Sequence, residues 1–303
     1  MSRFAPLFVI IAAALWGIDG IVLRPALYSL PVPLVVLIES SIVALLLSPI
    51  FMKQYPKLKL LEGKDWLAFF GVALFGGAIG TMAITKALFY VNFVNLSIVI
   101  LIQKLQPVFA LTFAALILKE RLPKIFFLWS ATAIAGAYLM TFGISLPNMS
   151  TGDKTMVAAV FSLIAAISFS SSTVFSKRAL RNVGFEMGTY LRFLFSAVIM
   201  LVIVLSYGEI GSLAAVTVNQ WLIFLLIAFT TGGAAIFLYY YGLKKITASV
   251  ATICELAFPL TAVVLEYFLH GNILSPVQWL GVALLIFSII KVSGINLLGT
   301  KGK

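Results

Sequence analysis

Residues 11–27 read Ile-Ala-Ala-Ala-Leu-Trp-Gly-Ile-Asp-Gly-Ile-Val-Leu-Arg-Pro-Ala-Leu. Residues 164–180, which lie 153 positions later, read Ile-Ala-Ala-Ile-Ser-Phe-Ser-Ser-Ser-Thr-Val-Phe-Ser-Lys-Arg-Ala-Leu. The same offset places Glu39 over Arg192. The two stretches form the first block of a predicted internal repeat.

Two prolines extend this internal repeat. Pro107 lies over Pro259 at an offset of 152, and Gln103 lies over Glu255 four residues upstream of each proline. Apolar segments align by chance more readily than segments of soluble proteins do, so each block alone is weak evidence for a repeat. Blocks that agree on nearly one offset together predict an internal duplication.

The composition is that of a membrane protein. Apolar residues make up 62% of the 303 positions and charged residues 10%, whereas a soluble domain keeps roughly a quarter of its residues charged. Apolar runs of about 20 residues recur along the chain, and each is long enough to cross a hydrocarbon layer of about 30 Å as a helix. Backbone polar groups find no water in that layer, so helices are required. We therefore predict an all-α integral membrane protein.

Ten transmembrane helices are predicted, with Pro31, Pro33, Pro123, Pro147 and Pro276 in the connections, where helices end. The spans are Leu7–Leu27, Val32–Met52, Trp66–Tyr90, Phe93–Leu118, Ile125–Ile144, Thr155–Leu180, Met187–Tyr207, Trp221–Leu243, Ala248–His270 and Val277–Gly294.

Basic residues fix the predicted orientation, because cytoplasmic loops carry an excess of Lys and Arg. With the N-terminus in the cytosol, the opposite loops hold only Lys154, with Arg24 and Lys86 near outer helix ends. The cytosolic side then holds Arg3, Lys53, Lys57, Lys59, Lys64, Lys119, Arg121, Lys124, Lys177, Arg178, Arg181, Lys244, Lys245, Lys291, Lys301 and Lys303. Both termini are thus predicted to be cytoplasmic, in a multi-pass protein of the cell inner membrane. The net charge of +11 reflects this orientation rather than a nucleic-acid surface.

Five helices per copy is an odd number, so the second copy must enter the membrane upside down. Residues 1–146 and 153–303 are predicted to be two inverted-topology five-helix repeats that form one compact membrane unit. Inverted repeats of this kind create a central site that can face either side of the membrane.

The sequence resembles a known family. Leu15-Trp16-Gly17 lies in the first helix, Glu120-Arg121-Leu122 closes the fourth, and Arg192 lies early in the seventh. Together with the paired prolines, these features make the chain similar to a ten-helix, EamA-type member of the drug/metabolite transporter superfamily over essentially its whole length. The resemblance implies export or exchange of small metabolites, often amino acids or related amines, through a central cavity. It also shows departures, since Glu39 and Gln106 stand where relatives often have an arginine and an acidic residue.

Charged residues inside the predicted spans are candidates for the transport pathway, because each one in lipid needs a partner or a wet cavity. They are Asp19, Arg24, Glu39, Lys86, Lys104, Arg192, Glu255 and Glu266. A structural ion pair is the alternative for each, and Arg24 and Lys86 are expected to extend towards the membrane surface. Asp19 and Glu39 lie at similar depth and could share one site, paired with Arg24 or Lys86.

The ninth helix carries the most informative pattern. Glu255, Pro259, Glu266 and His270 lie on one helical face. A proline kink frees carbonyls near Glu255, which suits a cation or a substrate ammonium group. We expect Glu255, Asp19 and Glu266 to be candidates for proton or ion coupling. A structural pair of Glu255 with Lys104 or Arg192 is the alternative.

Amide and aromatic side chains complete the predicted pathway. Gln103 and Gln106 share one face of the fourth helix and either bind substrate or join helices. Tyr239-Tyr240-Tyr241 is interpreted as part of an interfacial aromatic belt, with an aromatic cage as the alternative. The substrate-binding or pathway residues are therefore predicted to be Trp16, Asp19, Glu39, Gln103, Lys104, Gln106, Arg192 and Glu255.

These observations favour a secondary active transporter, an exporter or exchanger of a small polar organic metabolite such as an amino acid or related amine. A lipid-handling translocase or channel is the alternative. An enzyme is not expected, because the single histidine, His270, has no partners for a metal or a catalytic triad, and there is no nucleotide-binding loop. Expected partners are a small-molecule substrate, membrane lipid and a coupling ion or proton, but no cofactor, metal or nucleic acid. The chain is expected to act as a monomer or homodimer.

Overall fold

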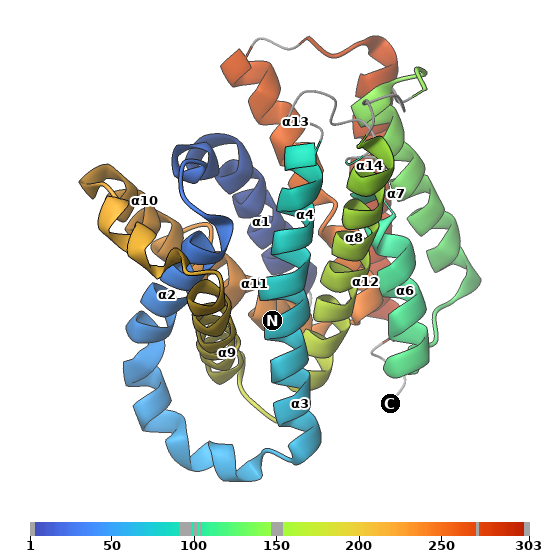
Figure 1. Cartoon of the computed structure of the whole chain (residues 1–303). Coiled ribbons are helices and arrows are strands. Elements are labelled where there is room, and N and C mark those ends of the chain that lie inside the picture. Colours follow the sequence, from blue (N-terminus) through green and yellow to red (C-terminus); the bar gives the residue numbers. More distant parts are fainter. Residues whose placement is uncertain are drawn as a thin grey trace.

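The computed structural model describes residues 4–90, 99, 102–103, 105–146, 154–270 and 273–299. Every regular element among them is a helix (Figure 1). In chain order they are α1 (Ala5–Ile18), η2 (Asp19–Leu23), η3 (Arg24–Leu27), α2 (Val32–Gln54), η4 (Tyr55–Leu60), α3 (Gly63–Gly71), η5 (Val72–Ile79), α4 (Gly80–Tyr90), α6 (Gln106–Ile117), α7 (Lys124–Phe142), α8 (Thr155–Ala179), α9 (Phe185–Ser206), η6 (Glu209–Ala215), α10 (Val218–Phe229), α11 (Gly233–Lys245), α12 (Ala248–Cys254), α13 (Ala257–His270) and α14 (Pro276–Gly299).

Within the described part of the chain, nine helical stretches are long and apolar enough to cross a membrane. They are Ala5–Leu27, Val32–Pro49, Gly63–Ala87, Lys124–Phe142, Met156–Ala179, Phe185–Ser206, Val218–Lys245, Ala248–Leu269 and Pro276–Gly294. Each overlaps one predicted span. The remaining predicted span, Phe93–Leu118, is described only in part, and its described end is the shorter apolar helix α6. The prediction of an all-helical membrane protein is confirmed for the described residues.

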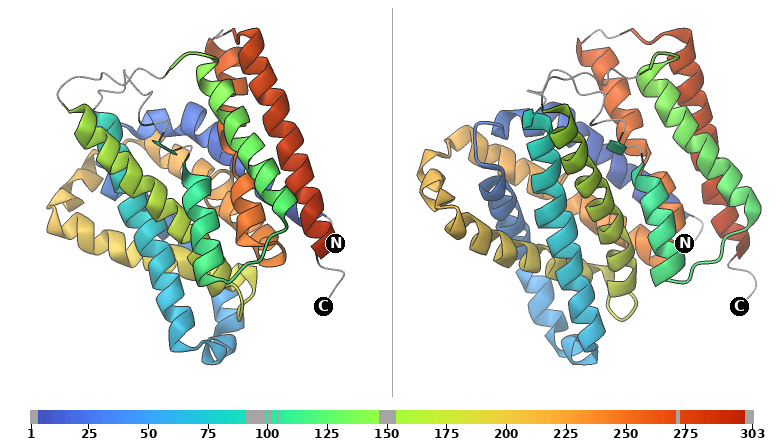
Figure 2. Two further views of the ribbon diagram at one scale, coloured as in Figure 1. Left: turned by 90° about the vertical axis from the view of Figure 1, so that its right-hand side faces the viewer. Right: turned by 45° about the vertical axis from the view of Figure 1, so that its right-hand side comes forward.

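Glycines allow the last helix of each half to pack closely. Helix α7 lies along α14 (Figure 2). A Cβ atom on Gly281 would lie 2.3 Å from the backbone nitrogen of Met140, and one on Gly136 would lie 2.8 Å from that of Leu285. Small residues let the two backbones approach each other. Close packing matters in a membrane because lipid supplies no hydrophobic drive for helix association. The other main contacts pair α2 with α9, α1 with α11, and α4 with α8.

Several spans depart from regular α-helix near the middle of the bundle. The first span changes to a π-helix at η2, and the third does so at η5. The eighth is broken between α10 and α11, and the ninth between α12 and α13. Irregular backbone at membrane depth is tolerated where it is buried in protein or lines a cavity, because its polar groups cannot bond to lipid.

Polar contacts join several basic connections at one end of the molecule. Arg178 donates to Asp65 at 2.8 Å, and Asn182 donates to the same carboxylate at 2.8 Å. At that end the carboxylate of Glu120 accepts hydrogen bonds from the backbone nitrogens of Ala248 and Ser249, at 2.7 and 3.1 Å. These nitrogens begin α12, and a carboxylate there satisfies donors that the helix leaves free.

Candidate functional site

A cavity with two adjoining lobes lies among the irregular segments. The larger lobe has a volume of about 620 Å³ and the smaller about 400 Å³. Both lobes are lined by Trp16, Asp19, Arg24, Gly76, Thr81, Ile84, Arg192 and Ile236. These volumes lie within the range of roughly 300–1,000 Å³ that is typical of small-molecule sites.

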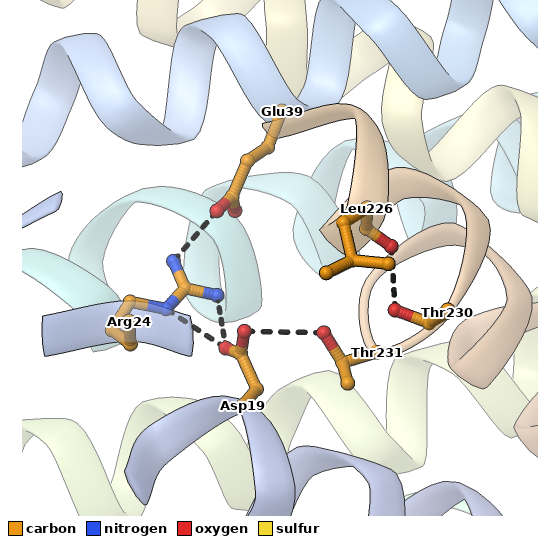
Figure 3. A network of polar contacts seen from close by, with 6 residues as sticks. All are labelled: Asp19, Arg24, Glu39, Leu226, Thr230 and Thr231. Carbon is orange, nitrogen blue, oxygen red and sulfur yellow. Dashed lines mark hydrogen bonds and ion pairs between the residues drawn. The ribbon is translucent and has the colours of Figure 1, made fainter. Parts of the chain in front are cut away.

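A partly buried ionic triad borders the smaller lobe (Figure 3). Arg24 lies between two carboxylates, with Nε 2.8 Å from Oδ2 of Asp19 and Nη1 2.9 Å from Oε1 of Glu39. Thr231, in the break between α10 and α11, donates to the other oxygen of Asp19 at 3.1 Å. Removing these charges from water is costly, so each depends on the others.

The triad decides between two expectations for Arg24. Its side chain does not extend to the membrane surface but turns inward and joins Asp19 to Glu39. The π-helix η2 explains this geometry, because the wider turn brings Arg24, at the start of η3, back over Asp19. The prediction that Asp19 and Glu39 share a site with Arg24 is confirmed, and the prediction of an outward Arg24 is wrong.

Glu255 lies in the break between α12 and α13 and lines the larger lobe. Its Oε1 accepts hydrogen bonds from the hydroxyl of Tyr239 at 2.6 Å and from that of Thr173 at 3.3 Å. Its Oε2 accepts one from the amide of Gln106 at 3.4 Å. Glu255 forms no ion pair with Arg192 in the described part of the chain. Among the described residues, its side-chain hydrogen bonds therefore come from neutral donors.

Arg192 extends from α9 to the boundary between the two lobes. Its Nη1 donates to the hydroxyl of Tyr240 at 3.4 Å, and the guanidinium lies 5.8 Å from the centre of that ring. The Tyr240 hydroxyl also contacts the hydroxyl of Ser176 at 2.9 Å. Among the described residues no carboxylate forms an ion pair with Arg192.

The other predicted site residues divide into three groups. Trp16 lines both lobes, and its ring lies 5.3 Å from that of Tyr239. Gln103 lines the larger lobe but donates to the carbonyl of Ser162 at 2.9 Å, so it also joins two helices. Lys104 and the side chain of Glu266 lie outside the described residues.

Sequence reasoning missed several polar residues of the cavity. Tyr239 and Tyr240 are 3% and 0% exposed, so the prediction of an interfacial belt is wrong for them. Thr173 was missed although a signal existed, because Ser170–Thr173 lies over Gly17–Gly20 at the repeat offset. The Gly232–Gly233 pair could likewise have indicated the helix break that carries Thr231.

Helices of membrane-spanning length around a cavity with charged lining residues are what a multi-pass membrane transporter requires. The model of the EamA-like transporter family matches residues 3–142 and again residues 156–294. The chain therefore belongs to the EamA-like transporter family, which is a family of transporters and not of enzymes. This confirms the resemblance seen in the sequence.

Individual relatives differ in how much of the chain they match. The riboflavin transporter ImpX of Fusobacterium nucleatum subsp. nucleatum is 49% identical over 291 residues, which cover 96% of this chain and 97% of that protein. The uncharacterized transporter YwfM of Bacillus subtilis is 28% identical over 62% of this chain and 60% of its own length. The uncharacterized inner membrane transporter YedA of Escherichia coli K12 is 26% identical over 62% of this chain and 58% of its own length.

A crystal structure shares the fold. It superposes with a TM-score of 0.74 and covers 96% of each chain at 17% identity.

Proposed function

We propose that this chain is a secondary active transporter of riboflavin. The observation that carries the proposal is its 49% identity, over nearly the full length of both chains, to a protein named as a riboflavin transporter. Riboflavin replaces the amino acid or related amine that the family resemblance implied. The cavity supports this choice, because it offers aromatic rings beside hydroxyl and carboxylate groups, as a planar ring with a polyhydroxyl chain requires.

The proposed architecture has ten spans in two inverted repeats, residues 1–146 and 153–303, with both termini in the cytosol. Helix packing supports it. Helix α1 of the first span packs against α11 of the eighth. The repeat offset relates these two spans to the sixth and the third, and α8 of the sixth span packs against α4 of the third. The same offset relates α2 to α9 and α7 to α14, and the two helices of each pair pack against each other. A twofold axis between the halves would give this pattern.

The distribution of charge supports the proposed orientation. The contacts of Arg178 and Glu120 gather basic connections at one end of the molecule, and cytoplasmic loops are the basic ones. Single cysteines in a Cys254→Ser background test the orientation. Impermeant maleimide added outside right-side-out vesicles should label Ser29→Cys and Gly211→Cys but not Arg121→Cys or Arg181→Cys. Equal labelling of all four positions would contradict it.

The proposed mechanism is alternating access, with Glu255 as the carrier of a coupling proton. Three neutral donors surround this carboxyl group at a break in the ninth span. Both protonation states can be satisfied there, because a protonated carboxyl can donate as well as accept. Opening the cavity to one side and then the other would expose the group to each compartment in turn.

Counterflow in proteoliposomes tests the transport activity. Vesicles preloaded with unlabelled riboflavin should accumulate labelled riboflavin, with a rate that saturates as external riboflavin rises. Arg181→Gln, at the basic end and outside the cavity, is a control that should keep this rate. Flux that rises without saturation would favour a channel or a lipid-handling translocase, and an absence of counterflow with riboflavin would reject the proposed substrate.

A further inference from the structure

We infer how riboflavin lies in the two lobes: the tricyclic ring occupies the larger lobe, the ribityl chain occupies the smaller lobe, and Arg192 binds the pyrimidine edge of the ring between them. The inference rests on the proposed riboflavin transport and assigns a separate recognition task to each part of the site.

The larger lobe suits a flat aromatic ring. Trp16, Tyr239, Phe169 and Phe258 line it. Aromatic side chains bind planar rings through stacked and edge contacts. Thr252 also lines this lobe, and its buried hydroxyl has no hydrogen-bond partner in the described part of the chain. A buried hydroxyl without a partner is costly, and a ring nitrogen or carbonyl of the ligand would satisfy it.

The smaller lobe suits a polyhydroxyl chain. The carboxylates of Asp19 and Glu39 border it, and so do the hydroxyl groups of Ser40, Thr85 and Ser196. Carboxylates accept hydrogen bonds from ligand hydroxyls, and such charge-assisted bonds are stronger than neutral ones. The volume of about 400 Å³ leaves room for a flexible chain.

The covalent structure of riboflavin places Arg192 opposite a particular edge of the ring. The ring nitrogen that carries the ribityl chain adjoins the nitrogen and carbonyl of the pyrimidine edge. A ligand that spans both lobes therefore brings these two acceptors to the lobe boundary. Arg192 lines both lobes, carries a planar set of donors and has no ion-pair partner among the described residues.

Ligand binding to purified protein tests this arrangement, with flavin fluorescence as the signal. Riboflavin is compared with lumiflavin, which has the same ring but a methyl group in place of the ribityl chain. We expect Arg192→Gln to weaken the binding of both ligands by about tenfold or more, because it removes charge-assisted bonds to the ring. We expect Glu39→Gln to weaken riboflavin binding by a similar factor and to change lumiflavin binding less than twofold.

Controls separate a local effect from a folding defect. Arg181→Gln and Glu209→Gln make the same chemical changes outside the cavity and should leave both affinities unchanged. Glu39→Asp is a second triad variant in case Glu39→Gln unfolds, because Glu39 lines the smaller lobe and not the larger one. A monodisperse elution profile is required of every variant.

Two results would overturn the inferred position of riboflavin but would not contradict the proposal that the protein transports riboflavin. One is loss of riboflavin binding but not of lumiflavin binding in Arg192→Gln. The other is equal loss of both ligands in the triad variants. If the unmodified protein bound neither flavin, the proposed function and the inference would both be wrong.

Discussion

The hydroxyl of Tyr239 lies 2.6 Å from Oε1 of Glu255 and joins the eighth span to the break in the ninth. Thr173 of the sixth span reaches the same oxygen at 3.3 Å, and Gln106 at the start of α6 reaches the other oxygen. One carboxyl group thus contacts three other spans. A change in its protonation state alters the hydrogen bonding of all three, which is what a coupling residue requires.

Glu255→Gln should separate exchange from coupled uptake. The amide keeps the shape of the carboxyl group but cannot bind and release a proton. Riboflavin counterflow should continue at a measurable rate, whereas uptake driven by an imposed pH gradient should fall at least tenfold. Parallel measurements in proteoliposomes check this, with Glu209→Gln as the matched control. Gradient-driven uptake at the unmodified rate would exclude Glu255 as the proton carrier.

Arg24→Met should destabilise the protein. It leaves two carboxylates facing each other; loss of one partner of a fully buried ion pair typically costs about 3–5 kcal/mol, and the partial exposure of Arg24 and Glu39 should make the cost smaller. The combined variant Arg24→Met, Asp19→Asn and Glu39→Gln removes the unpaired charges and should regain most of that loss. Thermal unfolding in detergent measures both. Similar melting temperatures for Arg24→Met and the unmodified protein would show that the triad is solvated.

Gly281→Ala should weaken the contact between α7 and α14. The added methyl group would meet the backbone of Met140, and overpacking of this kind costs about 1–3 kcal/mol. Gly294→Ala is the matched control on the same helix, because no atom of another described part of the chain lies within 4 Å of the place that its Cβ would occupy. The control should keep or slightly raise the melting temperature, since alanine favours helix more than glycine does. Equal effects of the two substitutions would argue against close packing at Gly281.

Riboflavin 5′-phosphate should bind more weakly than riboflavin. The phosphate adds a charge of about −1.5 to −2 at the end of the ribityl chain. If that chain lies in the smaller lobe, the phosphate meets Asp19 and Glu39, whose partner Arg24 is already engaged. The dissociation constant should rise at least tenfold, and fluorescence titration measures it. Equal affinity for the two flavins would place the end of the chain away from the triad.

The global features of this protein could be predicted from its sequence because they depend on local properties. Apolar runs and prolines locate the spans to within a few residues, and an intramembrane charge needs a partner wherever it lies. Asp19, Glu39 and Glu255 could therefore be proposed as pathway residues from the sequence, and all three line the cavity.

The hydrogen-bond partners of Glu255 could not be predicted in the same way. Tyr239 and Thr173 contact Glu255 from spans that are distant in sequence, and neither tyrosine nor threonine is unusual in a membrane helix. The inward direction of Arg24 depends on the π-helix η2, which the residue pattern does not predict. Side-chain direction is determined by backbone irregularity here, and such irregularity is a property of the assembled bundle.

Glu120 links the two sequence repeats through three hydrogen bonds. Its carboxylate accepts from the backbone nitrogens of Ala248 and Ser249 and from the hydroxyl of Ser249. Hydrogen bonds to a charged group contribute roughly 1.5–3 kcal/mol each. Under the proposed alternating access, a movement that separates α6 from α12 at this end would break these hydrogen bonds. Glu120→Gln would then shift the balance between the two proposed open forms without touching the ligand.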